Sequence, residues 1–135
     1  ALLSNGRRYG CDFVVSATGV DANVDLARGV EGQGPVVDID PAGGIRVNES
    51  MQSSDPAIYA AGDACSVVLE TGEGADEERS WFQMRLWSQA HAQGAWAAAC
   101  LLGRQDCAPS PFEIFAHATH FLGHKVVLLG RFNAQ

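Results

Sequence analysis

Short apolar runs that end in small residues and glycine dominate the hydrophobic pattern of this chain. The run at residues 13–15, Phe-Val-Val, is β-branched and aromatic and leads into Gly19. A second run at residues 58–61 leads into Gly62 and Asp63. Buried parallel strands that stop at a ligand-facing loop have this pattern. Both runs are therefore predicted to be short buried strands.

Between these two runs, the pattern predicts a β-hairpin. Residues 35–40 form one short strand candidate, and residues 45–48 alternate apolar and polar side chains as a half-exposed strand does. The sequence Pro-Ala-Gly-Gly at residues 41–44 has the composition of a turn. Further along, the acidic, glycine-rich residues 70–78 are predicted to form a solvated surface loop.

A long helix is predicted over residues 80–102. Ser80 and Gln83 have the spacing of a capping box at its start, and Gly103 ends it. Residues at three- and four-residue spacing form a stripe of mostly small side chains, which favours close packing against a sheet. The stripe consists of Trp87, Ala90, Gly94, Ala97, Ala98 and Leu101.

The last part of the chain is predicted to begin a second unit. Residues 104–111 contain proline and form a candidate linker. Residues 112–122 are predicted to be helical, and the apolar residues 125–130 to form a strand.

The composition is that of a folded, acidic segment. Of the 135 residues, 47% are hydrophobic and 19% are charged, and the formal net charge is -7. Proteins that bind a nucleic-acid backbone need a basic stripe, so nucleic acid is not an expected partner. No apolar run approaches the ~20 residues that span a bilayer, so no membrane partner is expected. The chain starts at Ala1 rather than Met, which favours a segment of a longer protein.

Cysteine and histidine spacing predicts neither a disulfide framework nor a metal site. The four cysteines contain no Cys-x-x-Cys pair and are expected to be reduced, with Cys65 as inert packing. His117, His120 and His124 would share one face of a helix, but no Glu completes a His-Glu-x-x-His zinc motif. These histidines are therefore expected to border an amphipathic face.

The order of the elements is more informative than any one of them. An Asp at the carboxyl end of a parallel strand lies at the crevice where α/β folds bind ligands. Asp63 can accept hydrogen bonds from a ribose or ribityl hydroxyl there, and Gly62 allows the backbone to approach. The start of the following helix offers free N–H groups and a dipole that favour negative charge, such as that of a reduced flavin.

With these motifs in this order, the chain resembles the FAD- and NAD(P)H-dependent pyridine nucleotide-disulfide oxidoreductases. Residues 16–19, Ser-Ala-Thr-Gly, and residues 58–63, Ile-Tyr-Ala-Ala-Gly-Asp, look like the two late motifs of that family. Residues 11–20, 83–90 and 125–130 look like one branch of it. The resemblance covers nearly the whole chain.

The resemblance implies an α/β fold: the second half of a split FAD-binding Rossmann-like domain plus the start of a C-terminal α+β domain. The implied boundaries are the end of the NAD(P)H-binding domain at 1–26, the C-terminal half of the FAD-binding domain at 27–104, a linker at 105–111 and the C-terminal domain from 112 to 135. Residues 21–23, Asp-Ala-Asn, depart from the Thr-Pro-Asn common in the family. The chain contains no Gly-x-Gly-x-x-Gly motif, so neither pyrophosphate-binding loop of the family lies within it.

The resemblance also implies three sets of cofactor-binding residues. By this resemblance, the crossover from the nucleotide domain consists of Ala17, Thr18 and Gly19. The turn that binds the ribityl chain consists of Gly62 and Asp63. The helix start beneath the isoalloxazine ring consists of Gln83, Met84 and Arg85. No catalytic acid, base or thiol nucleophile is implied.

The implied function of the full-length parent is passage of hydride from NAD(P)H through FAD to an unidentified acceptor, either a small molecule or a protein. The segment alone is expected to be inactive. Two alternatives stay open: a truncated, non-catalytic fragment that acts, if at all, as an interaction module, and a free-standing ligand-binding module that uses Asp63. The resemblance further implies a cytoplasmic and nuclear location and a homodimer through the C-terminal domain.

Overall fold

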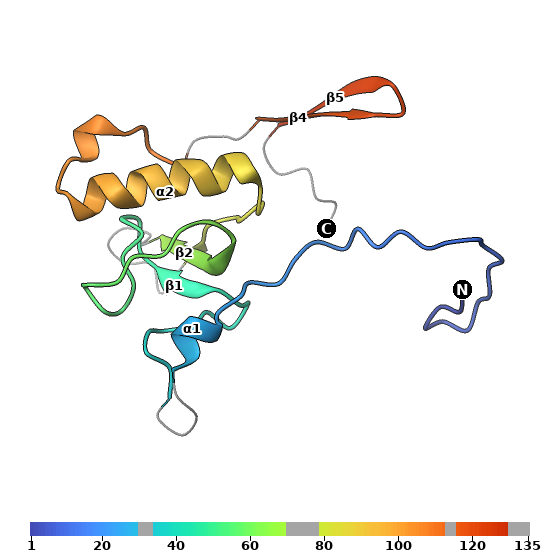
Figure 1. Cartoon of the computed structure of the whole chain (residues 1–135), viewed down its shortest axis with the longest axis horizontal. Helices are drawn as coiled ribbons and strands as arrows, with labels where there is room; N and C mark the ends of the chain where they lie inside the picture. The colour runs from blue at the N-terminus through green and yellow to red at the C-terminus, as the bar shows by residue number, and fades with distance from the viewer. Residues whose placement is uncertain (30–33, 70–78, 113–115, 130–135) are drawn as a thin grey trace.

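Two extended segments project from a small α/β body in the computed structural model shown in Figure 1. The structure describes residues 1–29, 34–69, 79–112 and 116–129. In chain order, its elements are α1 (Asp25–Arg28), β1 (Ile45–Val47), the 3₁₀ turn η1 (Gly62–Ala64), β2 (Cys65–Leu69), β3 (Arg79–Ser80), α2 (Trp87–Leu101), the 3₁₀ turn η2 (Gln105–Cys107), β4 (Ala116–Phe121) and β5 (His124–Leu129).

A three-stranded sheet in the order β1-β2-β3 forms the centre of the body. β1 runs parallel to β2, with Ile45 opposite Cys65 and Val47 opposite Val67. β3 runs antiparallel to β2 on its other side. The first four residues of β2, Cys-Ser-Val-Val, are apolar or small and are buried. β1 pairs with residues 65–67, and β3 pairs with residues 68 and 69. The strand β2 was not predicted from the sequence, although its β-branched run is typical of one.

The main core lies between α2 and this sheet (Figure 1). A smaller cluster joins Ala27 of α1 to Val24 and Val37, with Ile45 of β1 at its edge. The main core includes Val47, Val67 and Ala97, and joins β1, β2 and α2. Trp81 and Phe112 pack at its edge with ring centroids 5.4 Å apart in a T-shaped arrangement, a favoured geometry for aromatic pairs.

Helix α2 begins later than the sequence predicts. The expected capping box at residues 80–83 is wrong because Ser80 already belongs to β3, which pairs with β2. The chain then stays non-helical until Leu86, the residue before the helix, which has an extended conformation (φ -105°, ψ 148°). The predicted end is confirmed: Gly103 has φ +64° and donates its N–H to the Cys100 carbonyl at 3.0 Å.

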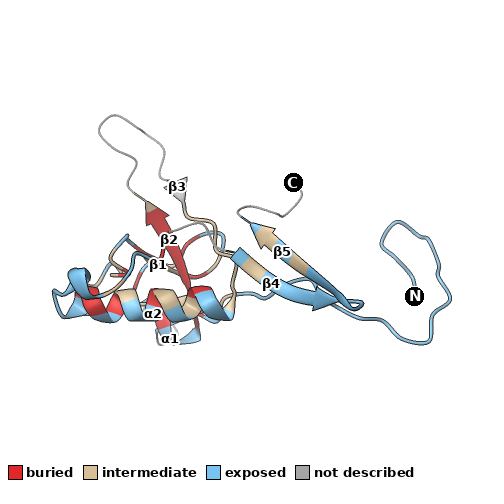
Figure 2. Ribbon diagram, turned by 90° about the horizontal axis from the view of Figure 1, so that it is seen from above, coloured by how far each residue is buried: buried red, intermediate tan, exposed pale blue. Residues whose placement is uncertain are grey.

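The buried face of α2 also differs from the predicted stripe. Trp87 and Leu101 are 87% and 61% exposed, and of the six stripe residues Ala97 is the one that is buried. The face against the sheet instead carries two glutamines, Gln89 and Gln93. Figure 2 shows buried residues in red along α2 and in β2. Hydrophobic spacing cannot find such a face because its key side chains are polar.

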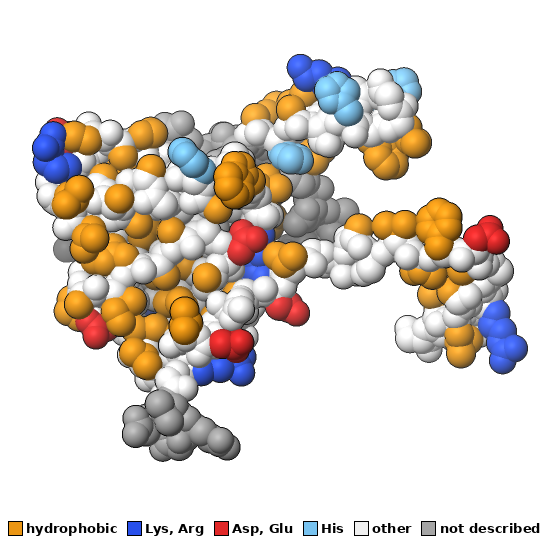
Figure 3. Space-filling view, in the orientation of Figure 1, with side chains coloured by type: hydrophobic (Ala, Val, Ile, Leu, Met, Phe, Trp, Pro, Cys, Tyr) orange, Lys and Arg blue, Asp and Glu red, His pale blue; other side chains and the backbone are white. Residues whose placement is uncertain are grey.

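The two strands predicted beside ligand loops are not formed. Residues 13–15 are extended but solvent-exposed, and no strand pairs with them in the described part of the chain. They belong to an N-terminal arm, residues 1–20, on which hydrophobic side chains gather (Figure 3). Residues 58–61 are extended too, but Tyr59 makes one isolated bridge, to Gln52. Strand propensity alone cannot form a strand where no neighbour supplies a ladder of hydrogen bonds.

The hairpin predicted from residues 35–40 and 45–48 is confirmed, but its first strand is shorter than expected. Ile39 bridges Ile45 in antiparallel fashion, and the Asp40 N–H donates to the Gly44 carbonyl at 2.9 Å across the turn. The second arm of the hairpin becomes β1 and the first shrinks to a single bridge.

The C-terminal part is a two-stranded hairpin, so the helix predicted over residues 112–122 is wrong. β4 pairs with β5 in register from Ala116 opposite Leu129 to Phe121 opposite His124. Leu122 and Gly123 form the connecting turn with φ of +48° and +81°, as the favoured two-residue hairpin turn requires. β5 confirms the predicted strand through residue 129, while residue 130 lies outside the described ranges.

Two further expectations concern loops and membranes. The predicted acidic loop at 70–78 lies outside the described residues. Within the described ranges, no helix is both long and apolar enough to cross a bilayer.

Candidate functional site

The turn η1 is held directly in front of the buried strand β2. Gly62 starts it with φ +77°, a left-handed conformation that glycine adopts without strain. The Gly62 carbonyl accepts the Cys65 N–H and so closes the turn. A Cβ placed on Gly62 would lie 3.2 Å from the Cβ of Ala90 on α2. The turn is therefore pressed against the helix, and Asp63 is left exposed.

Two glutamine side chains connect this turn to its surroundings. The Gly62 N–H donates to Gln93 Oε1 at 2.9 Å. Gln93 Nε2 donates to Gln83 Oε1 at 2.9 Å, and Gln83 Nε2 donates to the Cys65 carbonyl at 3.1 Å. The side chains of Gln83 and Gln93 thus link the backbone on either side of Asp63.

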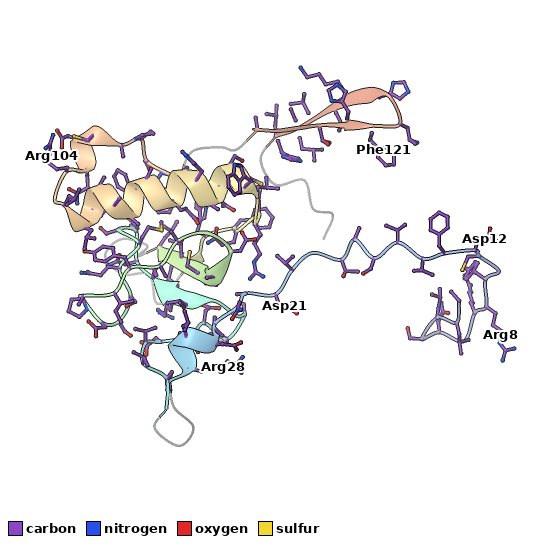
Figure 4. All side chains as sticks on the ribbon, in the orientation of Figure 1. Arg8, Asp12, Asp21, Arg28, Arg104 and Phe121 are labelled. Atoms are coloured by element: carbon purple, nitrogen blue, oxygen red, sulfur yellow. The ribbon has the colours of Figure 1, made fainter. Side chains whose placement is uncertain are left out.

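A second contact joins the segment before α2 to the N-terminal arm. Arg85 has φ +53°, which is uncommon for a residue with a side chain, and its N–H donates to Gln89 Oε1 at 3.0 Å. Its guanidinium donates to the Val20 carbonyl. Figure 4 places the next residue, Asp21, where the arm joins the body.

The predicted site residues are therefore brought together in part. Gly62, Gln83 and Arg85 lie within one hydrogen-bonded region, and Met84 is half-buried beside them. Arg85 reaches Val20, the residue after Gly19, whereas Ala17, Thr18 and Gly19 themselves are exposed on the arm.

The Cys65 thiol lies inside this region but is not activated. It is fully buried and lies 3.3 Å from the Gly62 carbonyl. Burial raises its pKa to about 11 from 9.0. A thiol with this pKa stays protonated near neutral pH and is a poor nucleophile, in agreement with the predicted packing role.

The three histidines do not share a face. On the hairpin, His117 lies opposite Leu128 and His120 opposite Lys125, and side chains three apart on a strand point to opposite faces. Among the described residues, no group of three histidine, cysteine or carboxylate side chains could hold a metal ion.

A hollow of about 200 Å³ lies beside β1, and Asp38, Asn48 and Val68 are among the residues that line it. It shares no residue with η1 or with residues 81–86.

Comparison with known proteins assigns the family. The family model described as "Pyridine nucleotide-disulphide oxidoreductase" matches residues 1–94. The chain belongs to the pyridine nucleotide-disulphide oxidoreductase family. This agrees with the resemblance carried by the Ser-Ala-Thr-Gly and Ile-Tyr-Ala-Ala-Gly-Asp motifs, and the family together with the structure indicates an α/β Rossmann-like fold.

Several relatives of this chain carry the same name. Proteins called pyridine nucleotide-disulfide oxidoreductase domain-containing protein 1 from Rattus norvegicus and Dictyostelium discoideum are 45% and 40% identical to it over 98% of the chain. The match covers 26% of each relative, so the chain spans about a quarter of their length. A crystal structure of Fdr9 is similar over 98% of this chain and 31% of its own, with a TM-score of 0.61 and 26% identity.

Two residues of the region escaped the sequence analysis. Gln89 and Gln93 lie one turn apart on α2 and are 1% and 0% exposed. The signal for them was present, since two glutamines at i and i+4 stand in an alanine-rich helix, on the face that hydrophobic spacing leaves unassigned.

Proposed function

We propose that the full-length protein passes hydride from NAD(P)H through FAD to an acceptor, and that this segment supplies the second half of a split FAD-binding domain. Family membership supports an oxidoreductase, and the observation that carries the cofactor proposal is the clamped turn η1 with its exposed acid, Asp63.

The residues of η1 fit a polyhydroxyl chain. Asp63 makes no hydrogen bond within the described part of the chain, so both carboxylate oxygens are available as acceptors. An ionised carboxylate accepts short, strong hydrogen bonds from hydroxyl groups. Gly62 keeps the backbone beside it free of a side chain. In this proposal, Asp63 binds the ribityl hydroxyls and Gly62 leaves room for them.

The residues before α2 fit the part of a reduced flavin ring that carries negative charge. In this proposal, Gln83, Met84 and Arg85 lie beneath the isoalloxazine ring, where the Arg85 guanidinium and the nearby start of α2 at Trp87 favour negative charge. Ala17, Thr18 and Gly19 lie near FAD at the crossover, next to the contact between Arg85 and Val20. FAD supplies the redox chemistry when bound, and these residues bind and orient it.

The remainder of the proposed enzyme lies outside this chain. The glycine-rich loops that bind the two pyrophosphates would belong to the other three quarters of its length, as the match to 26% of each relative supports. The same proposal includes a homodimer formed through the C-terminal domain, a cytoplasmic and nuclear location, and no role for nucleic acid or membrane.

The test is made on the full-length protein, whose size is first measured by immunoblot of source tissue with an antibody against this segment. The purified protein should show the visible absorption of FAD, and NADH or NADPH should bleach it. Asp63→Ala should release the flavin. Asp106→Ala is the matched control because its carboxylate is 76% exposed and faces Arg104 after the far end of α2. A full-length protein without flavin would refute the proposal.

A further inference from the structure

Gln89 and Gln93 are buried amides on the face of α2 that packs against the core. Both are almost completely excluded from solvent, at 1% and 0% exposure. Burying an amide without hydrogen-bond partners costs on the order of several kcal/mol. A buried glutamine is therefore expected to make specific hydrogen bonds. Gln89 holds the Arg85 N–H, and Gln93 holds the Gly62 N–H.

Only one orientation of the Gln93 and Gln83 side-chain amides satisfies all of the hydrogen bonds between Gly62, Gln93, Gln83 and Cys65. The Gly62 N–H can only donate, so the oxygen of Gln93 must face it. The Gln93 amide nitrogen then faces Gln83, whose oxygen accepts, and the Gln83 nitrogen is left to face the Cys65 carbonyl, which can only accept. The main chain at both ends therefore sets the orientation of both amides.

This relay encloses two residues, Asp63 and Ala64. It starts at the Gly62 N–H and ends at the Cys65 carbonyl, so the turn between them is held at both ends. The same turn is pressed on α2 at Ala90, one helical turn before Gln93. Hydrogen bonding and close packing thus fix the same short stretch of backbone.

We infer that Gln93 is a positioning residue: with Gln83 it clamps both ends of the turn η1 and fixes the direction in which the Asp63 carboxylate points toward a polyhydroxyl ligand. The ligand part of this inference rests on the proposed function, whereas the clamp itself is a property of the folded chain. The pair Gln83 and Gln93 is called the glutamine clamp below.

The test compares three variants of the full-length protein. Gln93→Met keeps an unbranched side chain of similar length and removes both hydrogen bonds. Gln83→Met removes the other half of the clamp. Ala97→Gly, one turn further along the same buried face, is the control, because it weakens α2 by about 1 kcal/mol without touching the clamp.

The first readout is hydrogen exchange of the Gly62 amide, which needs no cofactor. Exchange is expected to rise about tenfold in Gln93→Met relative to Ala97→Gly, which corresponds to the loss of one hydrogen bond of ~1.4 kcal/mol. An unchanged exchange rate at Gly62 would show that the clamp does not hold the turn.

The second readout is the dissociation constant of FAD. Gln93→Met is expected to weaken FAD binding about tenfold. Gln83→Met is assessed by Gly62 exchange alone, because Gln83 is also proposed to lie beneath the isoalloxazine ring. Ala97→Gly should bind FAD as the unchanged protein does. Faster exchange at Gly62 with unaltered FAD affinity would overturn the positioning role. A full-length protein that binds no FAD would overturn the proposed function and the ligand part together, and Gly62 exchange would still decide the clamp.

Discussion

Replacing Gly62 by alanine tests how closely η1 is pressed against α2. The new Cβ meets two separate obstacles. The backbone has φ +77°, and a left-handed conformation costs an L-residue with a side chain roughly 1–2 kcal/mol. The Cβ would also lie 3.2 Å from the Ala90 Cβ, closer than ordinary van der Waals contact, so the helix or the turn must shift.

Gly62→Ala is expected to lower the free energy of local opening of α2 by about 2 to 3 kcal/mol. Conformational strain contributes roughly 1–2 kcal/mol, and a less flexible unfolded chain offsets about 0.4–1 kcal/mol of it. Overpacking against Ala90 adds about 1–2 kcal/mol. Removing the Ala90 methyl group should therefore rescue part of the loss. In an Ala90→Gly background, Gly62→Ala should cost only about 1 kcal/mol, the strain that remains.

Native-state hydrogen exchange in the full-length protein measures both numbers. The protected amides in the second half of α2 report the local opening free energy, in which a tenfold faster exchange corresponds to about 1.4 kcal/mol. The four proteins of the cycle are the unchanged protein, the two single variants and the double variant. An equal cost of Gly62→Ala in both backgrounds would refute the close contact, and no cost in either would refute the left-handed turn.

Three further outcomes are expected. The Cys65 thiol should resist alkylation in the folded protein, and a thiol that alkylates as fast as a free one would contradict its burial. As pH rises from 9.0 to about 11, the free energy of unfolding should fall by about 2 to 3 kcal/mol, because the thiol ionises in the unfolded chain while the folded chain retains its proton. Cys65→Ala should flatten that pH dependence in thermal melts. Trp81→Phe should cost little, since the buried Trp81 Nε1 has no partner among the described residues, whereas Trp96→Phe loses a 2.9 Å bond to the Glu49 carbonyl and should cost about 1 kcal/mol in denaturant titrations; equal costs would contradict this assignment. Arg85→Ala should speed limited proteolysis of the N-terminal arm, because it removes the bond to the Val20 carbonyl, and an unchanged cleavage rate would show that this bond does not hold the arm.

The sequence predicted elements well where local chemistry determines them. Glycines with positive φ, such as Gly103 after α2, mark real ends of elements, and the turn at residues 41–44 forms as its composition indicates. These features depend on backbone preferences of a few adjacent residues. Asp63 is different: it was expected at the carboxyl end of a strand over residues 58–61, whereas it lies in the turn η1 before β2, a strand that was not predicted.

Elements that depend on distant partners were predicted poorly. Residues 13–15 have strand propensity but no neighbouring strand in the described part of the chain. Residues 116–121 became β4 because β5 pairs with them along their whole length. The buried face of α2 was missed because Gln93 is held by hydrogen bonds rather than by hydrophobic packing. Pattern analysis along one sequence contains no information on such pairing.

The contact between η1 and α2 limits how the family can vary over evolutionary time. A Cβ at position 62 would lie 3.2 Å from the Ala90 Cβ, so a side chain at 62 is accommodated best when glycine stands at 90. Conversely, alanine at position 90 favours glycine at position 62. The two positions, 28 apart in sequence, should therefore change together among relatives, and an alignment of many such sequences should show them as a covarying pair of small residues.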